Sequence, residues 1–303
     1  MIPFIFTKAK IVNIEYSDAG YEEQIRYYDA GRKPVAGPDN AYGQKREFDD
    51  YGRMIRQTSI DQNGKTMIDS KGNATMKYKY DKLGNIIEAV ALDENNKPVM
   101  TKSGWYEYHA KYDDLNGNKI YEVYSGKDKK SVLIKDGYAA IKYKYDDYGN
   151  AIRIDYLGID GKSVRSNYGY AAVQLVYGNE NGNITRADYL GMDGKPVRSK
   201  DGYAGRTAKY NDNGKVIYES YFDTNGKAIL NQNGYAAIRY KYDDYGNTIR
   251  IDYLGIDGKS VHSKDGYAGW TAKYNENGKV IYESYFDTNG KAVDLPPENQ
   301  SGY

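Results

Sequence analysis

The chain has 303 residues, and its 43 basic and 42 acidic residues leave a net charge of +1. This balance provides no basic face for nucleic acid and no polybasic helix for a membrane surface, and no apolar run approaches the ~20 residues of a membrane span. Tyrosine (36 residues) and glycine (33) are abundant and cysteine is absent, which excludes disulfides and thiolate metal sites. Aliphatic residues are too sparse for one deep core and aromatic residues too frequent for disorder, so we expect a thin, tyrosine-packed architecture.

An aromatic residue recurs every 32 or 33 residues, directly before a turn. The positions are Tyr16, Phe48, Tyr80, Tyr112, Tyr145, Tyr177, Tyr210, Tyr242 and Tyr274. The two longer intervals each contain one extra turn residue, as stacked units tolerate. The sequence therefore predicts one array of nine units of about 32 residues over 1–293, followed by a tail at 294–303. Units in 137–293 are regular, with near-identical copies 64 residues apart, whereas those in 1–136 have diverged.

One unit shows the local structure that we expect throughout. Apolar and polar residues alternate over 140–145 and again over 152–156, which is the period of a β-strand. Asp146–Gly149 lies between them and predicts a short hairpin with a bulge, and Asp160–Gly161 predicts a second turn. No segment has the 3.6-residue period of a helix. We expect an all-β fold of tandem β-hairpin repeats that forms an elongated β-solenoid or an extended twisted sheet, in which neighbours stabilise hairpins that are marginal alone.

Two families resemble parts of this unit. Tyr221–Ala228 reads Tyr-Phe-Asp-Thr-Asn-Gly-Lys-Ala and recurs at Tyr285–Ala292. It resembles the cell-wall-binding repeats of Gram-positive bacteria, namely choline- and glucan-binding modules and the receptor-binding repeats of clostridial toxins. The other half of the unit, as in Tyr145–Asn150, is similar to the tyrosine–aspartate repeats of bacterial surface and toxin-shell proteins. The first resemblance implies aromatic sites for choline or sugar on a secreted or surface-exposed protein, although only Trp105 and Trp270 supply tryptophan here.

Catalytic chemistry has little support in the sequence. His109 and His262 are the only histidines, and we interpret both as drifted surface positions. The carboxylate pairs Asp146/Asp147 and Asp243/Asp244 occupy turns, where Asp bonds its own backbone. Calcium is an alternative for Asp223–Gly226 and Asp287–Gly290, but no bidentate glutamate follows at a regular distance. We therefore predict a protein that is not an enzyme, with no catalytic residue, metal site or cofactor.

The Gly-Tyr-Ala element of each unit is the better candidate for a binding site. The candidate ligand-binding residues are Trp105, Tyr138, Tyr170, Tyr203, Tyr235, Tyr267 and Trp270. Exposed rings stack on sugars or form cages for cations, but we favour the interpretation that most of these rings pack one unit against the next. Trp270 replaces Arg206 of an earlier copy, so we expect it to be exposed and to be the best single contact residue.

Three functions are compatible with these features. The first is a bacterial surface or secreted module that binds cell-wall or host polysaccharide through repeated, multivalent aromatic sites. The second is a structural spacer or adhesin stalk, and the third is a protein-interaction array. An enzyme would return to consideration if acidic residues from non-equivalent positions of two units met in one pocket.

Overall fold

The alternating segments form strands in the computed structural model, which describes residues 9–178 and 182–294. Its contacts divide the chain into two units. Residues 1–143 and 156–164 belong to the first unit, and residues 144–155 and 165–303 to the second. The expected tail falls almost entirely on residues 295–303, which lie outside the described part.

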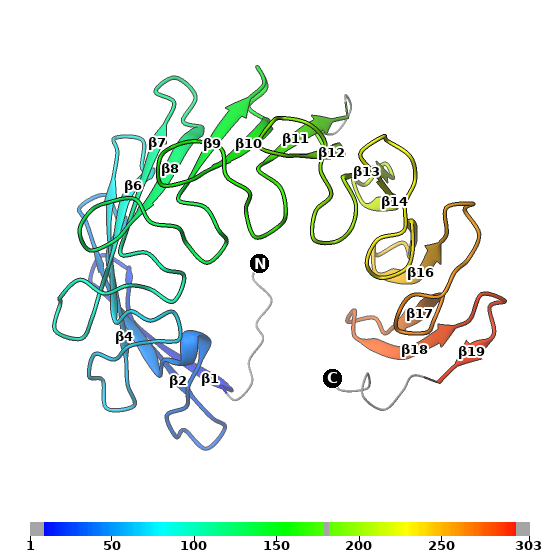
Figure 1. Cartoon of the computed structure of the whole chain (residues 1–303). Coiled ribbons are helices and arrows are strands. Elements are labelled where there is room, and N and C mark those ends of the chain that lie inside the picture. The colour runs from blue at the N-terminus through cyan, green and yellow to red at the C-terminus, as the bar shows by residue number, and fades with distance from the viewer. Residues whose placement is uncertain (1–8, 179–181, 295–303) are drawn as a thin grey trace. The chain divides into compact units, whose positions relative to one another are not determined.

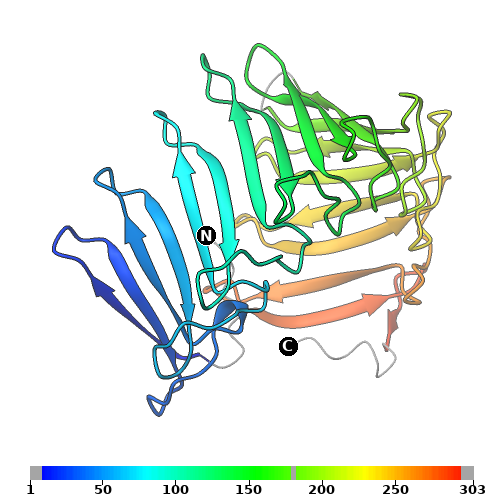
Figure 2. The same ribbon diagram turned by 60° about the vertical axis from the view of Figure 1, so that its left-hand side comes forward.

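The first unit is a run of antiparallel hairpins in which each strand pairs with its neighbours in sequence (Figures 1 and 2). Its strands are β1 (Ile11–Tyr16), β2 (Glu22–Tyr28), β3 (Gly43–Phe48), β4 (Met54–Ile60), β5 (Thr75–Tyr80), β6 (Ile86–Leu92), β7 (Glu107–Tyr112), β8 (Lys119–Ser125) and most of β9 (Ala140–Tyr145). Each hairpin packs directly on the next, because the second strand of one hairpin pairs with the first strand of its successor.

The second unit repeats this arrangement with greater regularity. Its strands are most of β10 (Ala151–Leu157), then β11 (Ala172–Tyr177), β12 (Ile184–Leu190), β13 (Gly205–Tyr210), β14 (Val216–Phe222), β15 (Ala237–Tyr242), β16 (Thr248–Leu254), β17 (Gly269–Tyr274), β18 (Val280–Phe286) and β19 (Ala292–Val293). The register is the same at each copy: Gly205 faces Phe222 in one hairpin, and Gly269 faces Phe286 in another.

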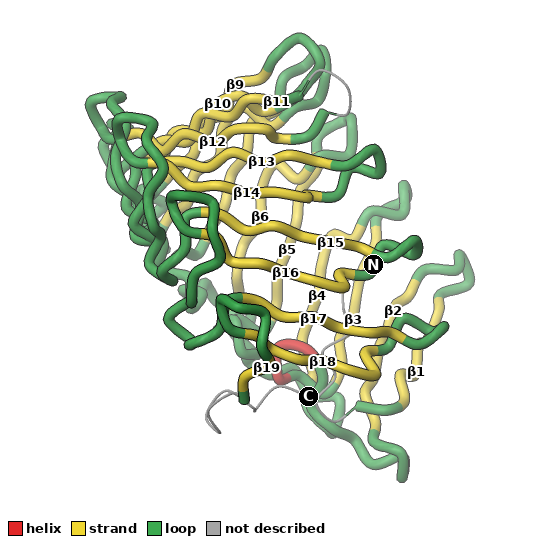
Figure 3. The backbone as a smooth tube through the Cα atoms, turned by 90° about the vertical axis from the view of Figure 1, so that its right-hand side faces the viewer, coloured by secondary structure: helices red, strands yellow, loops and turns green. Residues whose placement is uncertain are grey.

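The expected all-β class and tandem hairpins are confirmed. Neighbouring strands within each unit pair antiparallel among the described residues, so of the two expected architectures the units adopt the extended sheet and not the coils of a solenoid. The short 3₁₀ turn η1 (Pro38–Asn40), red in Figure 3, is the helical element among the described residues. No helix in that part of the chain has the length and apolar character needed to cross a membrane.

The aromatic that marks each repeat has a structural role that the sequence did not reveal. A bulge precedes it in the hairpin, as between Lys209 and Tyr210, and redirects its side chain. The Tyr210 hydroxyl then donates to the Ile184 carbonyl of the preceding hairpin at 2.7 Å. The same bond joins Tyr80 to Met54, Tyr112 to Ile86, Tyr177 to Ala151, Tyr242 to Val216 and Tyr274 to Thr248. We call these inter-hairpin tyrosine bonds.

The two faces of the sheet are packed differently. We call one of them the ladder face. It is the face that carries the paired side chains Tyr108 and Tyr124 in the first unit and Trp270 and Tyr285 in the second. On the opposite face, a small residue that begins the first strand of a hairpin faces a large one that ends the second. The pairs are Gly43–Ile60, Thr75–Leu92, Ala172–Leu190, Gly205–Phe222, Ala237–Leu254 and Gly269–Phe286. At Gly205 a Cβ would lie 2.3 Å from the Phe222 ring, so the small residue is required there.

Candidate functional site

A continuous row of tyrosine rings runs along the ladder face of the second unit. It alternates between the tyrosine of each Gly-Tyr-Ala element and a tyrosine near the end of the second strand. The ring centroids are separated by 4.4 Å for Tyr170–Tyr189, 5.7 Å for Tyr189–Tyr203, 4.5 Å for Tyr203–Tyr221, 6.2 Å for Tyr221–Tyr235, 4.5 Å for Tyr235–Tyr253, 5.8 Å for Tyr253–Tyr267 and 4.7 Å for Tyr267–Tyr285. These separations lie in the range of favourable aromatic pairs.

The first unit contains a shorter version of this tyrosine ladder. The ring centroids are 5.9 Å apart for Trp105–Tyr124, 6.3 Å for Tyr124–Tyr138 and 4.9 Å for Tyr138–Tyr156. Tyr138 is only 7% exposed and is among the buried hydrophobic residues. Six of the seven candidate ligand-binding residues therefore lie in the ladders, and they contact other rings from hairpin to hairpin. The interpretation that they pack unit against unit is confirmed.

Trp270 differs from its expected environment. It is half-buried rather than exposed, because the strand register places it on the ladder face between Ile251 and Tyr285. Arg206, its counterpart in the earlier copy, reaches the Glu219 carboxylate at 2.8 Å along the same face. A long side chain can lie on the sheet with its polar end at the edge, so the presence of Arg at this position did not indicate an exposed one.

Glutamates on the ladder face hold tyrosine hydroxyls, and the sequence reasoning missed them. Glu122 is 6% exposed, and it accepts bonds from Tyr108 at 3.2 Å, Tyr124 at 3.2 Å and Lys119 at 2.9 Å. Burial raises the pKa of Tyr108 to about 12, and burial followed by the Glu122 charge raises the pKa of Tyr124. These directions keep the hydroxyls protonated as donors. The signal was a Glu at an apolar-facing strand position, as in Tyr121-Glu122-Val123.

Two further copies contain a related arrangement. Glu219 binds Arg206, and burial followed by the Glu219 charge raises the pKa of Tyr221. The Tyr285 hydroxyl donates to Glu283 at 2.6 Å. In each hairpin with such a glutamate, an alanine faces it across the strand pair and leaves room for it: Ala110, Ala208 or Ala272. Glu122 is buried and Glu219 and Glu283 are partly buried, and all three bind a neighbouring side chain, so these contacts stabilise the ladder face.

The turn aspartates close the hairpins, as the turn interpretation predicted. One oxygen of Asp146 accepts from the amides of Tyr148 at 3.0 Å and Asn150 at 2.8 Å. The hydrogen bond from the Asn150 side-chain amide, aided by backbone donors and opposed by burial, holds the pKa of Asp146 below its usual value. Asp243 makes the same contacts with its own turn. The alternative calcium loops are also ordinary turns, because Asp223 and Asp287 accept the amides of Lys227 and Lys291.

The most exposed large apolar side chains lie at the hairpin tips. Tyr51, Leu83, Tyr148 and Tyr245 directly precede a turn glycine, and Leu115 lies two residues before one. Their exposures are Tyr51 83%, Leu83 68%, Leu115 97%, Tyr148 92% and Tyr245 92%. We call these five side chains the apolar tips. Their position before a turn glycine was a visible signal in the sequence, although Asn213 and Asn277 hold the same position in two other hairpins.

The two histidines differ in environment. His262 is exposed, which agrees with a drifted surface position. His109 is half-buried on β7, and its Nε2 lies 3.3 Å from the Glu107 carboxylate. The His109 side chain is still 43% exposed, as a surface position would be, but it has an acidic partner that the sequence did not indicate.

No family model matches the sequence, and no curated protein matches it. Among solved structures, the chain is similar to the crystal structures of TcdB2-TccC3-TEV and TcdB2-TccC3, at TM-scores of 0.41 and 0.36 and 13% identity in both cases. These alignments cover 98% and 95% of this chain and 15% and 17% of those chains. The Tc holotoxin pore of Photorhabdus luminescens aligns at a TM-score of 0.33 and 12% identity, over 92% of this chain and 15% of that chain. This chain thus spans less than a fifth of the length of the structures to which it is similar.

Proposed function

We propose that this chain is a non-catalytic repeat module of a secreted or surface-attached bacterial protein. In this proposal it acts as a structural spacer or protein-interaction array without a small-molecule ligand. The observation that carries the proposal is the use of the candidate aromatic rings in packing. Tyr138, for example, is 7% exposed and lies between the rings of Tyr124 and Tyr156.

The energetics of the ladder support a structural role. A sugar or a choline group could reach the face of such a ring only by displacing its neighbour, which would expose apolar area worth about 25 cal/mol per Å². The hydroxyls are also engaged, as those of Tyr124 and Tyr285 are with Glu122 and Glu283. The turn carboxylates are bonded to their own backbone. These contacts support a module that acts as a spacer or offers a surface to a protein partner. They also support the proposal that the module is non-catalytic.

Polysaccharide binding through repeated aromatic sites is the second candidate function. The observation that favours it is the apolar tips, since Tyr51, Tyr148 and Tyr245 are exposed at the same turn position of different hairpins. Single rings bind sugars weakly, but repeated sites on one chain raise the avidity. The resemblance to cell-wall-binding repeats supports the same location, outside the cell or on a bacterial surface.

A binding screen separates the two candidates. The full chain is tested on arrays of cell-wall and host polysaccharides and with choline, beside a variant in which Tyr51, Tyr148 and Tyr245 are all changed to serine. The proposal predicts no saturable binding by the parent chain. Saturable binding that disappears in the triple variant would replace it with polysaccharide recognition at the tips. Binding that disappears in folded Trp270→Ala or Tyr203→Ala would instead establish the ladder as the ligand site.

A mechanical test examines the structural role directly. In single-molecule stretching of the full chain, stacked hairpins should open one after another. Each step should release about 32 residues, or on the order of 110 Å of extended chain. A single all-or-none rupture would contradict a repeat array whose stability comes from nearest neighbours.

A further inference from the structure

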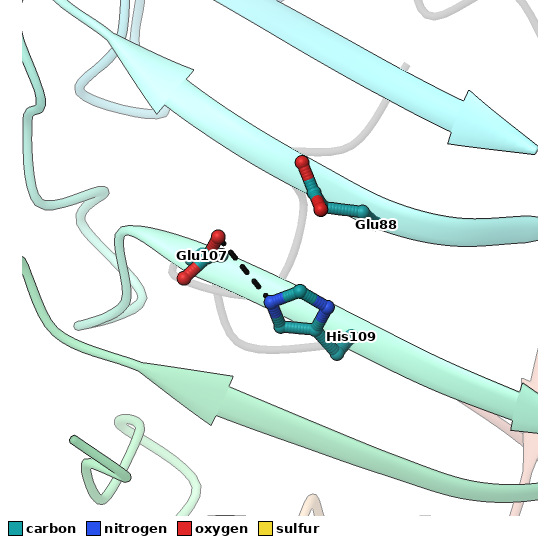
Figure 4. A group of neighbouring side chains, drawn as sticks. All are labelled: Glu88, Glu107 and His109. Carbon is teal, nitrogen blue, oxygen red and sulfur yellow. Dashed lines mark ion pairs between the residues drawn. The ribbon is translucent and has the colours of Figure 1, made fainter. Parts of the chain in front are cut away.

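Three metal-ligating side chains meet on the opposite face of the first unit. Glu107 and His109 lie two residues apart on β7, and Glu88 faces His109 from β6 (Figure 4). One potential ligand atom from each of the three lies within 4.8 Å of the others. His109 Nε2 and a Glu107 oxygen are already 3.3 Å apart. The cluster gathers acidic residues from non-equivalent positions of two adjacent hairpins.

The other hairpins contain a different set of residues at these positions. Where β6 has Glu88 and Val90, β12 has Arg186 and Asp188, which form an ion pair at 2.6 Å. Equivalent pairs join Arg153 to Asp155 and Arg250 to Asp252. Across from Asp188 and Asp252 the partner strand has Gly205 and Gly269, whereas across from Val90 it has Glu107. In this hairpin pair the acidic residue is therefore Glu107, on the neighbouring strand, and Glu88 stands where the other copies have the arginine that forms the ion pair.

A matching change in volume accommodates Glu107. It takes the place of the small member in the small–large pairs of the opposite face, and its partner across β8 is Ser125 rather than a phenylalanine or leucine. The order of small and large is reversed in this hairpin alone among the pairs described. Because Glu107 is buried, a side chain of its size requires a small partner such as Ser125, whereas an exposed substitution would not require a change in its partner.

The Glu107 carboxylate is buried without a cation of its own. Its side chain is only 9% exposed, and its polar partner is His109, inside the cluster. No further hydrogen-bond partner of this carboxylate lies among the described residues. A carboxylate removed from water is costly unless a cation or several donors compensate it. The carboxylates of Glu88 and Glu107 therefore place negative charge close together beside His109.

We propose that Glu88, Glu107 and His109 bind a divalent metal ion of the zinc class. One imidazole with two carboxylates suits Zn²⁺ and related first-row ions, in contrast to Ca²⁺ or Mg²⁺, which prefer oxygen ligands alone. In tetrahedral zinc sites with bonds of about 2.0–2.2 Å, ligand atoms lie about 3.3 Å apart. The His109–Glu107 pair already has this separation, and Glu88 closes the set by a small side-chain rotation. Three protein ligands leave one position for water or for a ligand from a partner.

Lys79 is the competitor for this site. Its Nζ lies 2.7 Å from a Glu88 oxygen, and the lysine side chain is 68% exposed. The Lys79 ammonium donates to the Glu88 carboxylate, so it must leave before Glu88 can bind a metal ion. A flexible exposed side chain can turn into solvent at little cost. Removal of Lys79 should therefore tighten metal binding, whereas a merely structural ion pair would not produce that result.

The test is a calorimetric titration of the full chain with zinc chloride. A second titration records the imidazole NMR signals of the two histidines. We expect one equivalent of Zn²⁺ to bind and to shift the signals of His109 only. His109→Ala and Glu88→Gln should each weaken binding by about tenfold or more, since loss of even a supporting contact typically costs 10–100-fold. Lys79→Met should strengthen it severalfold. His262→Ala is the matched control and should bind as the parent does.

Several outcomes would overturn the proposal. These are the absence of saturable Zn²⁺ binding, binding that is unchanged in His109→Ala, and binding that is lost in His262→Ala. Glu107→Gln keeps the shape of the buried side chain, so it provides a folded variant if Glu107→Ala unfolds. Its far-UV circular dichroism should match that of the parent while its zinc affinity falls. Full affinity in that variant would also contradict the assignment.

Discussion

The hairpins of β3–β6 and those of β11–β18 share one backbone plan but fill it differently. In the β11–β18 region, tyrosine occupies both ladder positions of each hairpin, namely the Gly-Tyr-Ala position and the next-to-last residue of the second strand. In β3–β6 the corresponding positions hold Ala41, Ser59, Asn73 and Ala91. Ser59 and Asn73 are buried there, and the Ser59 hydroxyl donates to Asp69 at 3.1 Å. A small polar cluster thus replaces a row of aromatic rings.

The features common to both regions identify what the repeat requires. Tyr80 and Tyr210 make the same inter-hairpin tyrosine bond to a backbone carbonyl. Asp81 and Asp146 close their turns through the same pair of amides. Strand pairing, turn closure and this hydroxyl bond define the hairpin array, whereas the ladder adds aromatic packing where it is present.

The largest expected effect is the removal of a central ladder ring. Tyr221→Ala should lower the free energy of unfolding by about 3–5 kcal/mol, because a buried aromatic side chain leaves a cavity between two rings. Ser59→Ala, at the same position of the ladder-free region, should cost only about 1 kcal/mol, the value of one hydrogen bond. Urea unfolding of both variants measures the difference. Equal losses would show that the ladder adds nothing beyond the polar cluster.

Alkaline pH should weaken the tyrosine-rich region. Burial raises the pKa of Tyr240 from its ordinary value of 10.0 to about 12, so the protonated ring is favoured in the folded state. Its contribution to stability is complete below pH 10 and is lost as the pH rises through 12. Circular dichroism with tyrosinate absorbance should show unfolding in this window. Tyr240→Phe should reduce the pH dependence, and an unchanged profile would contradict this assignment.

Loss of an inter-hairpin tyrosine bond should have the same moderate effect in both regions. Tyr210→Phe and Tyr80→Phe each remove one hydroxyl donor at 2.7 and 2.6 Å and leave the ring in place. We expect each to cost about 1 kcal/mol in urea unfolding. Phe48, which stacks on Tyr21 at 5.0 Å, occupies this position without a hydroxyl. A loss in only one region would show that the bond is not part of the common plan.

The smallest effect separates the two members of a turn carboxylate pair. Asp146→Ala removes the acceptor of two backbone amides and should slightly lower the melting temperature. Asp147 is exposed, so Asp147→Ala should leave the melting temperature unchanged. Similar losses in both variants would indicate that the pair acts as a unit rather than through the turn. Differential scanning calorimetry resolves the two cases.

The fold was more predictable than the site. The position of each strand and turn followed from alternation around residues such as Tyr143 and from the glycine after Asp146, since these are local preferences. Trp270 was misjudged because exposure depends on which face the register presents. Glu122 and the apolar tips were missed because hydroxyl partners and exposure appear only after neighbouring hairpins are paired.

Sequence alone determined the period, the hairpins, their bulged turns and the absence of regular helices from residues 9–178 and 182–294, because each depends on residues close together in the chain. The tertiary structure decided that the strands form a sheet rather than a solenoid within each unit. It also decided that the tyrosines pack on one another and that Glu88, Glu107 and His109 converge. Those outcomes depend on contacts between residues about 20–30 positions apart, for which a single sequence has no local signal.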